Sequence, residues 1–124
     1  MNVLDTSAWI EYLNGTEKGL NVKNIIDNGI IYTSSITLAE LSKWVHENNG
    51  DIFPVIEKVK TSSTLILLEE NILVESGKTY NELRKTRKKI SLIDSIIYTT
   101  CLIHGLNLIT KDSDFKDLPN VKSI

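Results

Sequence analysis

The sequence predicts a single domain of the α/β class, in which a parallel sheet is covered by helices on both faces. The chain has 124 residues, which is the usual size of one domain and is enough to bury one hydrophobic core. Short apolar segments alternate with helix-like segments along its length. These short segments are solidly apolar, as strands buried on both faces of a parallel sheet are.

The first half of the chain supplies two strands and three helices. Residues 2–5 form a short apolar strand that ends in an acid. Apolar residues at helical spacing predict helices over 7–14 and 16–27, each ended by an Asn-Gly pair. The β-branched and aromatic segment 30–33 predicts the second strand. A helix over 37–48 follows, with its apolar residues on one face and another Asn-Gly pair after it.

The second half continues the alternation and ends at the edge of the sheet. In order, we expect a helix over 52–61, a strand over 64–68, a long helix over 71–88, a helix over 91–104, a strand over 106–110, a helical turn over 114–118 and a short edge strand over 121–124. We find no linker, internal repeat or low-complexity segment, so residues 1–124 are expected to be one domain.

Composition and charge restrict the classes of protein that the chain can belong to. The formal net charge is -2, so any nucleic acid contact must use a local group of positive charges. Cys101 is the single cysteine, which fits a reducing compartment. The sequence has neither a signal peptide nor an apolar stretch of the roughly 20 residues that cross a bilayer. We therefore expect a cytoplasmic protein that does not enter the membrane.

Four acids fall at equivalent places in the predicted fold. Asp5 closes the first strand, and Asp112 follows the fourth. Glu40 and Asp94 are the last residues of the tetrapeptides TLAE and SLID, each three positions after a hydroxyl residue. The carboxyl ends of parallel strands share one rim, and ligands bind where the strand order reverses. If the first and fourth strands are neighbours, these acids meet at that rim.

A purely structural interpretation explains each acid taken alone. Both tetrapeptides match the capping box, and acids in a first turn favour the helix dipole. Taken together, however, the four carboxylates repel one another. Two unit charges about 4 Å apart cost roughly 4 kcal/mol at an effective dielectric near 20. A bound cation would relieve this repulsion, and hard oxygen ligands without a thiol or imidazole cluster favour Mg²⁺ or Mn²⁺, which can support phosphodiester hydrolysis.

The segments VLDTSAWIEYL, TLAEL, SLIDSIIYTTCLIHG and LITKDSDF occur in this order, and together they resemble PIN-domain ribonucleases. The similarity covers the whole chain and is greatest to the VapC-type toxins of VapBC toxin–antitoxin pairs. It implies a three-layer α/β/α fold with strand order 3-2-1-4-5. It also implies Mg²⁺- or Mn²⁺-dependent cleavage of RNA, a cognate antitoxin and a homodimer.

The same resemblance assigns roles to individual residues. It places the catalytic acids at Asp5, Glu40, Asp94 and Asp112, with Asp5, Asp94 and Asp112 as metal ligands. Hydroxyls that orient a carboxylate or water fall at Ser7 and Thr110, and an auxiliary acid at Asp114.

A basic run precedes SLID, formed by Arg84, Lys85, Arg87, Lys88 and Lys89. It fits either a solvated helix end, where cations suit the dipole, or a contact with the RNA backbone.

Two other functions fit parts of the pattern. A phospho-receiver domain has this size, an α/β fold and an acidic Mg²⁺ pocket, but here the first strand ends in one acid, and no lysine follows a proper fifth strand. A PIN-like module that binds RNA or a partner without cutting is the other alternative, although the four acids are intact.

Overall fold

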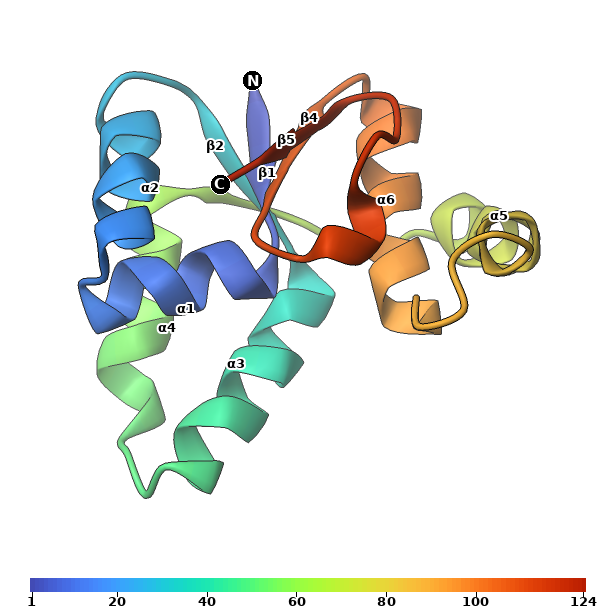
Figure 1. Cartoon of the computed structure of the whole chain (residues 1–124). Helices are drawn as coiled ribbons and strands as arrows, with labels where there is room; N and C mark the ends of the chain where they lie inside the picture. Colours follow the sequence, from blue (N-terminus) through green and yellow to red (C-terminus); the bar gives the residue numbers. More distant parts are fainter.

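A parallel sheet of five strands forms the centre of the molecule (Figure 1). The computed structural model describes all residues, 1–124. The strand order is β3-β2-β1-β4-β5, and every pair of neighbours is parallel. The strands are β1 (Asn2–Leu4), β2 (Ile31–Ser34), β3 (Thr64–Ile66), β4 (Asn107–Thr110) and β5 (Val121–Ser123). The predicted class and strand order are confirmed. This order also differs from the 2-1-3-4-5 order of receiver domains, which argues against that alternative.

Six α-helices and one short 3₁₀ helix connect the strands and make the outer layers (Figure 1). They are α1 (Thr6–Asn14), α2 (Glu17–Asp27), α3 (Ser35–Glu47), α4 (Ile52–Ser62), α5 (Glu70–Arg84), α6 (Leu92–His104) and η1 (Ser113–Phe115). Gly15 and Gly105 end α1 and α6 in the left-handed conformation that glycine adopts without strain. No helix combines the length and the apolar character that crossing a membrane requires.

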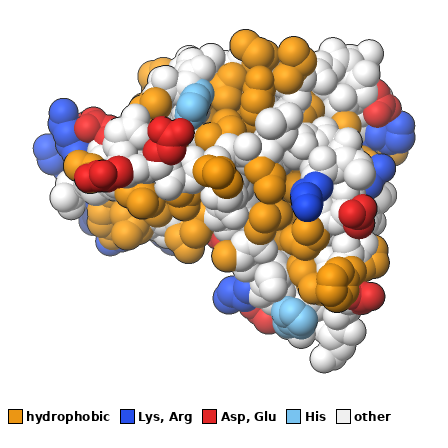
Figure 2. Space-filling view, turned by 180° about the vertical axis from the view of Figure 1, so that it is seen from behind, with side chains coloured by type: hydrophobic (Ala, Val, Ile, Leu, Met, Phe, Trp, Pro, Cys, Tyr) orange, Lys and Arg blue, Asp and Glu red, His pale blue; other side chains and the backbone are white.

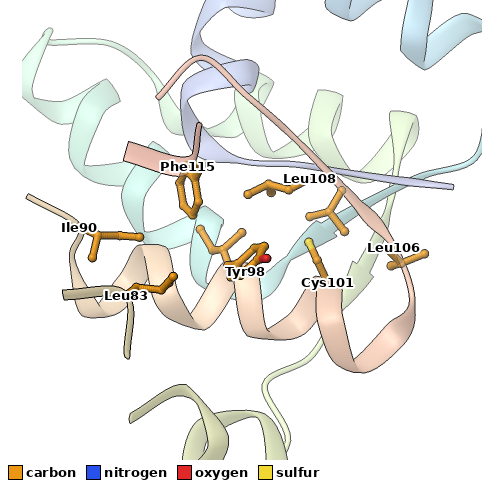
Figure 3. Packing of buried hydrophobic residues seen from close by; sticks show 9 residues of the cluster. Leu83, Ile90, Tyr98, Cys101, Leu106, Leu108 and Phe115 are labelled. Atoms are coloured by element: carbon orange, nitrogen blue, oxygen red, sulfur yellow. The ribbon is translucent and has the colours of Figure 1, made fainter. Parts of the chain in front are cut away.

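Successive residues of the central strands serve two cores, because side chains of a strand alternate between its faces. Val3 and Leu108 pack on the α6 side, together with Tyr98, Cys101 and Phe115 (Figure 3). The following residues, Leu4 and Ile109, pack on the other side with residues of α1 to α4: Ala8, Trp9, Val22, Leu41 and Val59. Helix α5 packs on α6 and adds Leu83 to the first core. The sheet is thus buried on both faces, as its uniformly apolar strands predicted.

Two α-helix boundaries differ from the predicted ones by two residues or more, and the last helical turn, η1, spans Ser113–Phe115 rather than 114–118. Helix α5 ends at Arg84 rather than at residue 88, because the chain must turn to bring Ile90 into the core after Leu83. Lys85, Arg87, Lys88 and Lys89 therefore lie beyond the helix, in turns and irregular chain. Helix α3 begins at Ser35 rather than at residue 37, which places Glu40 in its second turn. Ser34 is the N-cap residue and makes no side-chain cap bond, so TLAE is not a capping box.

Strand β3 is shorter than predicted and leaves an apolar surface beside it. It ends at Ile66, which pairs with Ser34, the last residue of β2, so no strand remains for Leu67 to pair with. Seen from behind, apolar side chains gather on parts of the surface (Figure 2). A hollow of about 380 Å³ beside β3 is lined mainly by hydrophobic residues, among them Met1, Tyr32 and Leu67. None of the four predicted site acids lines it.

Candidate active site

All four predicted acids line one small hollow at the carboxyl ends of β1 and β4. The hollow has a volume of about 250 Å³ and is lined by Asp5, Thr6, Ser7, Ile10, Glu40, Asp94, Ile97 and Asp112. Strands β1 and β4 are neighbours, and the order of the sheet reverses between them, which is the predicted place for a ligand. No lysine, arginine or histidine lines the hollow, so its lining is strongly negative.

Asp5 is the most enclosed of the four acids and is bound through both carboxylate oxygens. It is the N-cap of α1: Oδ1 accepts from the Ala8 N–H at 2.9 Å and from the Ser7 hydroxyl at 2.6 Å. Oδ2 accepts from the Thr110 hydroxyl at 2.5 Å. The residue is 4% exposed, and these bonds fix the orientation of its side chain.

The two hydroxyls predicted as supporting groups also hold the loop that carries Asp112. Ser7 Oγ accepts from the Lys111 N–H at 3.0 Å, and Thr110 Oγ1 accepts from the Asp112 N–H at 2.9 Å. Each hydroxyl therefore donates to Asp5 and accepts from the chain after β4. This network joins the ends of two strands more than 100 residues apart in the sequence.

Glu40 reaches the hollow from α3 and is held by a residue that the sequence did not single out. The Thr6 hydroxyl, at the first position of α1, donates to Glu40 Oε1 at 2.5 Å, and Oε2 accepts no hydrogen bond. A lone threonine after an Asp-terminated strand gives no signal of a contact with a helix 34 residues away. Thr6 is thus a site residue that sequence reasoning missed.

Asp94 has both the structural and the functional position that the sequence allowed. Ser91 Oγ accepts from the Asp94 N–H and Asp94 Oδ2 accepts from the Ser91 N–H, each at 3.0 Å, which completes a capping box. Oδ1 accepts no hydrogen bond, and the residue lines the hollow. The capping role uses one oxygen and leaves the other for a ligand.

Asp112 also uses one carboxylate oxygen as a helix cap, and Asp114 lies outside the hollow. Asp112 caps η1: its Oδ1 accepts from the Asp114 N–H at 2.8 Å, whereas Oδ2 accepts no hydrogen bond. Asp114 is half-buried and does not line the hollow, although its negative charge raises the pKa of Asp94. The structure therefore brings the four main acids together and leaves the auxiliary acid outside them.

Three of these carboxyls hold their protons more tightly than free acids do. Burial raises the pKa of Asp5 to about 6, against the opposing hydrogen bonds of Ser7, Thr110 and Ala8, and the charge of Asp112 raises it further. Burial also raises the pKa of Glu40 and of Asp94, and the charges of neighbouring carboxylates add to both shifts. Burial of the carboxylate is thus the common main cause, and the charges of neighbouring carboxylates add to it.

The donor set fits a hard divalent cation that keeps part of its water. The hollow offers carboxylate and hydroxyl oxygens and no thiol or imidazole. In this conformation no three acidic, histidine or cysteine side chains are close enough to share an ion directly. Mg²⁺ typically uses only one or two carboxylates and fills its other positions with water, which agrees with that spacing.

A larger groove adjoins the hollow and shares Thr6, Ile10 and Glu40 with it. Its volume is about 590 Å³, and half-buried Trp44 forms part of its wall. Ser91 and Ile93, which follow the basic run in the chain, line the same groove.

Within the basic run, the two arginines are tied to main-chain oxygens, whereas the lysines are exposed. Arg84 Nη1 donates to the Ile90 carbonyl at 3.4 Å, and Arg87 Nη2 donates to the Lys116 carbonyl at 2.9 Å. Lys85, Lys88 and Lys89 make no ion pair.

Comparison with known proteins places the chain in a family. A toxin–antitoxin complex from Klebsiella pneumoniae superimposes with a TM-score of 0.76 at 22% identity, over 98% of this chain and 96% of that chain. VapBC2 from Rickettsia felis, in a crystal structure with a promoter DNA fragment, gives a TM-score of 0.76 at 21% identity, over 98% and 97% of the two chains. VapC20 from Mycobacterium tuberculosis, described as a sarcin–ricin loop cleaving toxin, gives 0.74 at 16% identity, over 93% and 92%.

At sequence identities this low, the TM-scores show a shared fold and nothing further. The search of curated proteins gave no match. The family model described as PIN domain matches residues 3–121, which is nearly the whole chain. The chain belongs to the PIN-domain family.

Proposed function

We propose that this protein is an endoribonuclease that depends on Mg²⁺ or Mn²⁺ and acts in the cytoplasm as the toxin of a type II toxin–antitoxin pair. One observation carries the proposal: four carboxylates from separate segments of the chain line one hollow that has no cationic side chain. Such a hollow repels an RNA phosphate unless a cation is bound there. Membership of the PIN-domain family supports the same reaction class.

In this proposal Asp5, Asp94 and Asp112 hold the ion, one or two of them directly and the rest through its water molecules; Asp94 and Asp112 each offer an oxygen that accepts no hydrogen bond. A divalent ion at this place would neutralise charge on the phosphodiester and acidify a water molecule. Ser7 and Thr110 keep the Asp5 carboxylate in one orientation.

Burial raises the pKa of Glu40, which suits a group that accepts or donates a proton at Oε2. Asp114 supports Asp112 through its N–H group. All of these roles stay predictions until variants are measured.

Substrate and partners are argued from the surface and from the structural neighbours. RNA is the proposed substrate, and the exposed lysines of the basic run, with Arg84 and Arg87 beside them, are proposed to contact its backbone. Neighbours of the same fold were solved as complexes with antitoxins, which supports a cognate antitoxin here. We also propose a homodimer, which light scattering of the purified chain would test.

The deciding experiment is cleavage of total cellular RNA by the purified chain, with Mg²⁺, with Mn²⁺ and with EDTA. We expect cleavage only with a metal. The cleavage rate should fall by at least about 100-fold in Asp5→Asn and in Asp94→Asn, because a neutral amide cannot replace an anionic carboxylate as a ligand of the ion. Glu57→Gln is the matched control, since Glu57 is an exposed acid on α4 outside the hollow.

The same experiment separates this function from a PIN-like module that only binds. Such a module would bind RNA or a partner, and the RNA would stay uncut with either metal. Equal cleavage by the wild type and both Asp variants would place the activity elsewhere and overturn the assignment of the site.

A further inference from the structure

Lys111 lies between Thr110 and Asp112, yet its side chain does not line the acidic hollow. Its Nζ lies 2.8 Å from Oε1 of Glu11, on α1. The only lysine in the loop that carries a site acid is therefore paired with Glu11, which does not line the hollow.

Glu11 is an anchored residue rather than a mobile surface acid. Its side chain is 10% exposed, and its second oxygen, Oε2, accepts from the Thr16 hydroxyl at 3.0 Å. Helix α2 approaches its main chain so closely that a Cβ at Gly19 would lie 2.2 Å from the Glu11 carbonyl oxygen. Glu11 is thus held by the junction of α1 and α2, with one carboxylate oxygen directed at Lys111.

The main chain of Lys111 belongs to the network around Asp5. Its N–H donates to Ser7 Oγ, and the next N–H, that of Asp112, donates to Thr110 Oγ1. Exposed ion pairs contribute little, but here one member is nearly buried and both of its oxygens are used. The loop is therefore fixed on the inside by two hydroxyls and on the outside by one ion pair.

We propose that the Glu11–Lys111 ion pair is a clamp that positions Asp112 against Asp5. Glu11 and Lys111 are then positioning residues, which act on the reaction through the loop between β4 and η1. The importance of the clamp for cleavage rests on the proposed function, whereas its effect on the loop does not. A direct contact of Lys111 with an RNA phosphate is the competing use of this lysine.

Amide hydrogen exchange of the metal-free protein tests the clamp without any activity. In Glu11→Gln and in Lys111→Met, the amides of residues 111 and 112 should exchange about tenfold faster, while the amides of α6 keep their rates. Lys111→Arg retains the pair and should restore the slow exchange. Lys116→Met, an exposed lysine without an ion pair, is the control. Unchanged exchange in both Glu11→Gln and Lys111→Met would overturn the proposal.

RNA cleavage then separates the clamp from a direct contact. A clamp predicts that Glu11→Gln and Lys111→Met lower the cleavage rate by similar factors. It also predicts that the double variant cleaves no more slowly than the less active of the two single variants. A loss confined to Lys111→Met, with weaker RNA binding and a smaller salt dependence, would show a direct contact and overturn the clamp. If the wild type cuts no RNA, the proposed function fails, and the exchange rates still decide the clamp. If Glu11→Gln does not fold, Lys111→Met against Lys111→Arg gives the same comparison.

Discussion

Removing the Asp5 carboxylate should make the metal-free protein more stable at neutral pH. In the folded state the pKa of Asp5 is raised from 3.8 to about 6, chiefly by burial. A carboxyl with a raised pKa binds its proton more tightly when folded, so it favours folding at low pH and opposes it once the pH exceeds the folded value. Asp5→Asn removes this titration but keeps a side chain that can cap α1.

The size of the effect follows from the two pKa values. At 1.36 kcal/mol per pKa unit, the difference between 3.8 and about 6 corresponds to about 3 kcal/mol of lost stability above pH 7. Between pH 4.5 and pH 8 about two thirds of it develops, or about 2 kcal/mol. The amide costs about 1 kcal/mol at every pH, because it cannot accept from both hydroxyls as the carboxylate does. At pH 4.5 the first third of the loss, about 1 kcal/mol, already offsets the cost of the amide, so the variant should be about as stable as the wild type there and about 2 kcal/mol more stable at pH 8.

Urea unfolding in EDTA at pH 4.5, 6 and 8 measures this difference directly. Asp51→Asn is the matched control, because Asp51 caps α4 through the Phe53 N–H and is exposed, so its replacement should not stabilise the protein at pH 8. Mg²⁺ at pH 8 should reduce the advantage of Asp5→Asn by stabilising the wild type. A variant that is equally destabilised at all three pH values would show that the carboxylate is a net stabilising cap, and the argument that its burial destabilises the folded state would be wrong.

Three further predictions concern the metal, the packing and the RNA surface. Mg²⁺ should raise the melting temperature of the wild type at pH 8 and that of Asp94→Asn much less, as differential scanning fluorimetry would show; equal shifts would place the ion elsewhere. Gly19→Ala should lower the free energy of unfolding in urea by about 1–3 kcal/mol, because the new Cβ would overlap a main-chain oxygen of α1; an unchanged value would contradict the close helix contact. Replacing Lys85, Lys88 and Lys89 with glutamine should weaken RNA binding and reduce its salt dependence in filter-binding assays, while the melting temperature stays the same. An unchanged affinity for RNA would show that these lysines do not contact the RNA and belong only to a solvated turn.

The residue pattern predicted the parallel sheet and a shared rim for the acids, and the resemblance to PIN-domain ribonucleases supplied the strand order that lets the acids meet. Solidly apolar strands that alternate with helices restrict the topology, and the carboxyl ends of parallel strands must share a rim. Asp5 and Asp112 could therefore be placed at the same rim without knowledge of any side-chain contact, and the strand order implied by the resemblance placed them side by side. What could not be predicted depends on tertiary context. Helix α5 ends early because Ile90 has to enter the core, and α3 begins early without a side-chain cap.

Contacts between distant segments were also beyond the sequence. Thr6 donates to Glu40, and Lys111 pairs with Glu11, but threonine, lysine and glutamate are common surface residues and carry no periodic signal. Hydrogen-bonding capacity gives each of them many possible partners, and only the packing of α1 against α3 and β4 selects one. Such contacts fix the positions of the side chains in a site whose acids the sequence could already predict.

Structural and functional interpretations of the acids are not alternatives in this site. A carboxylate has two oxygens, and Asp94 and Asp112 each give one to a helix cap and leave the other without a hydrogen bond. The capping bonds lower the pKa of Asp94 against the effect of burial, so they favour the ionised form that a metal requires. At Asp5 the bonds from Ser7, Thr110 and Ala8 act in the same direction, although burial still outweighs them. The helix caps thus hold the acids in place, and at Asp5 and Asp94 their hydrogen bonds oppose the rise in pKa that burial causes, which favours the ionised form that binds a divalent ion.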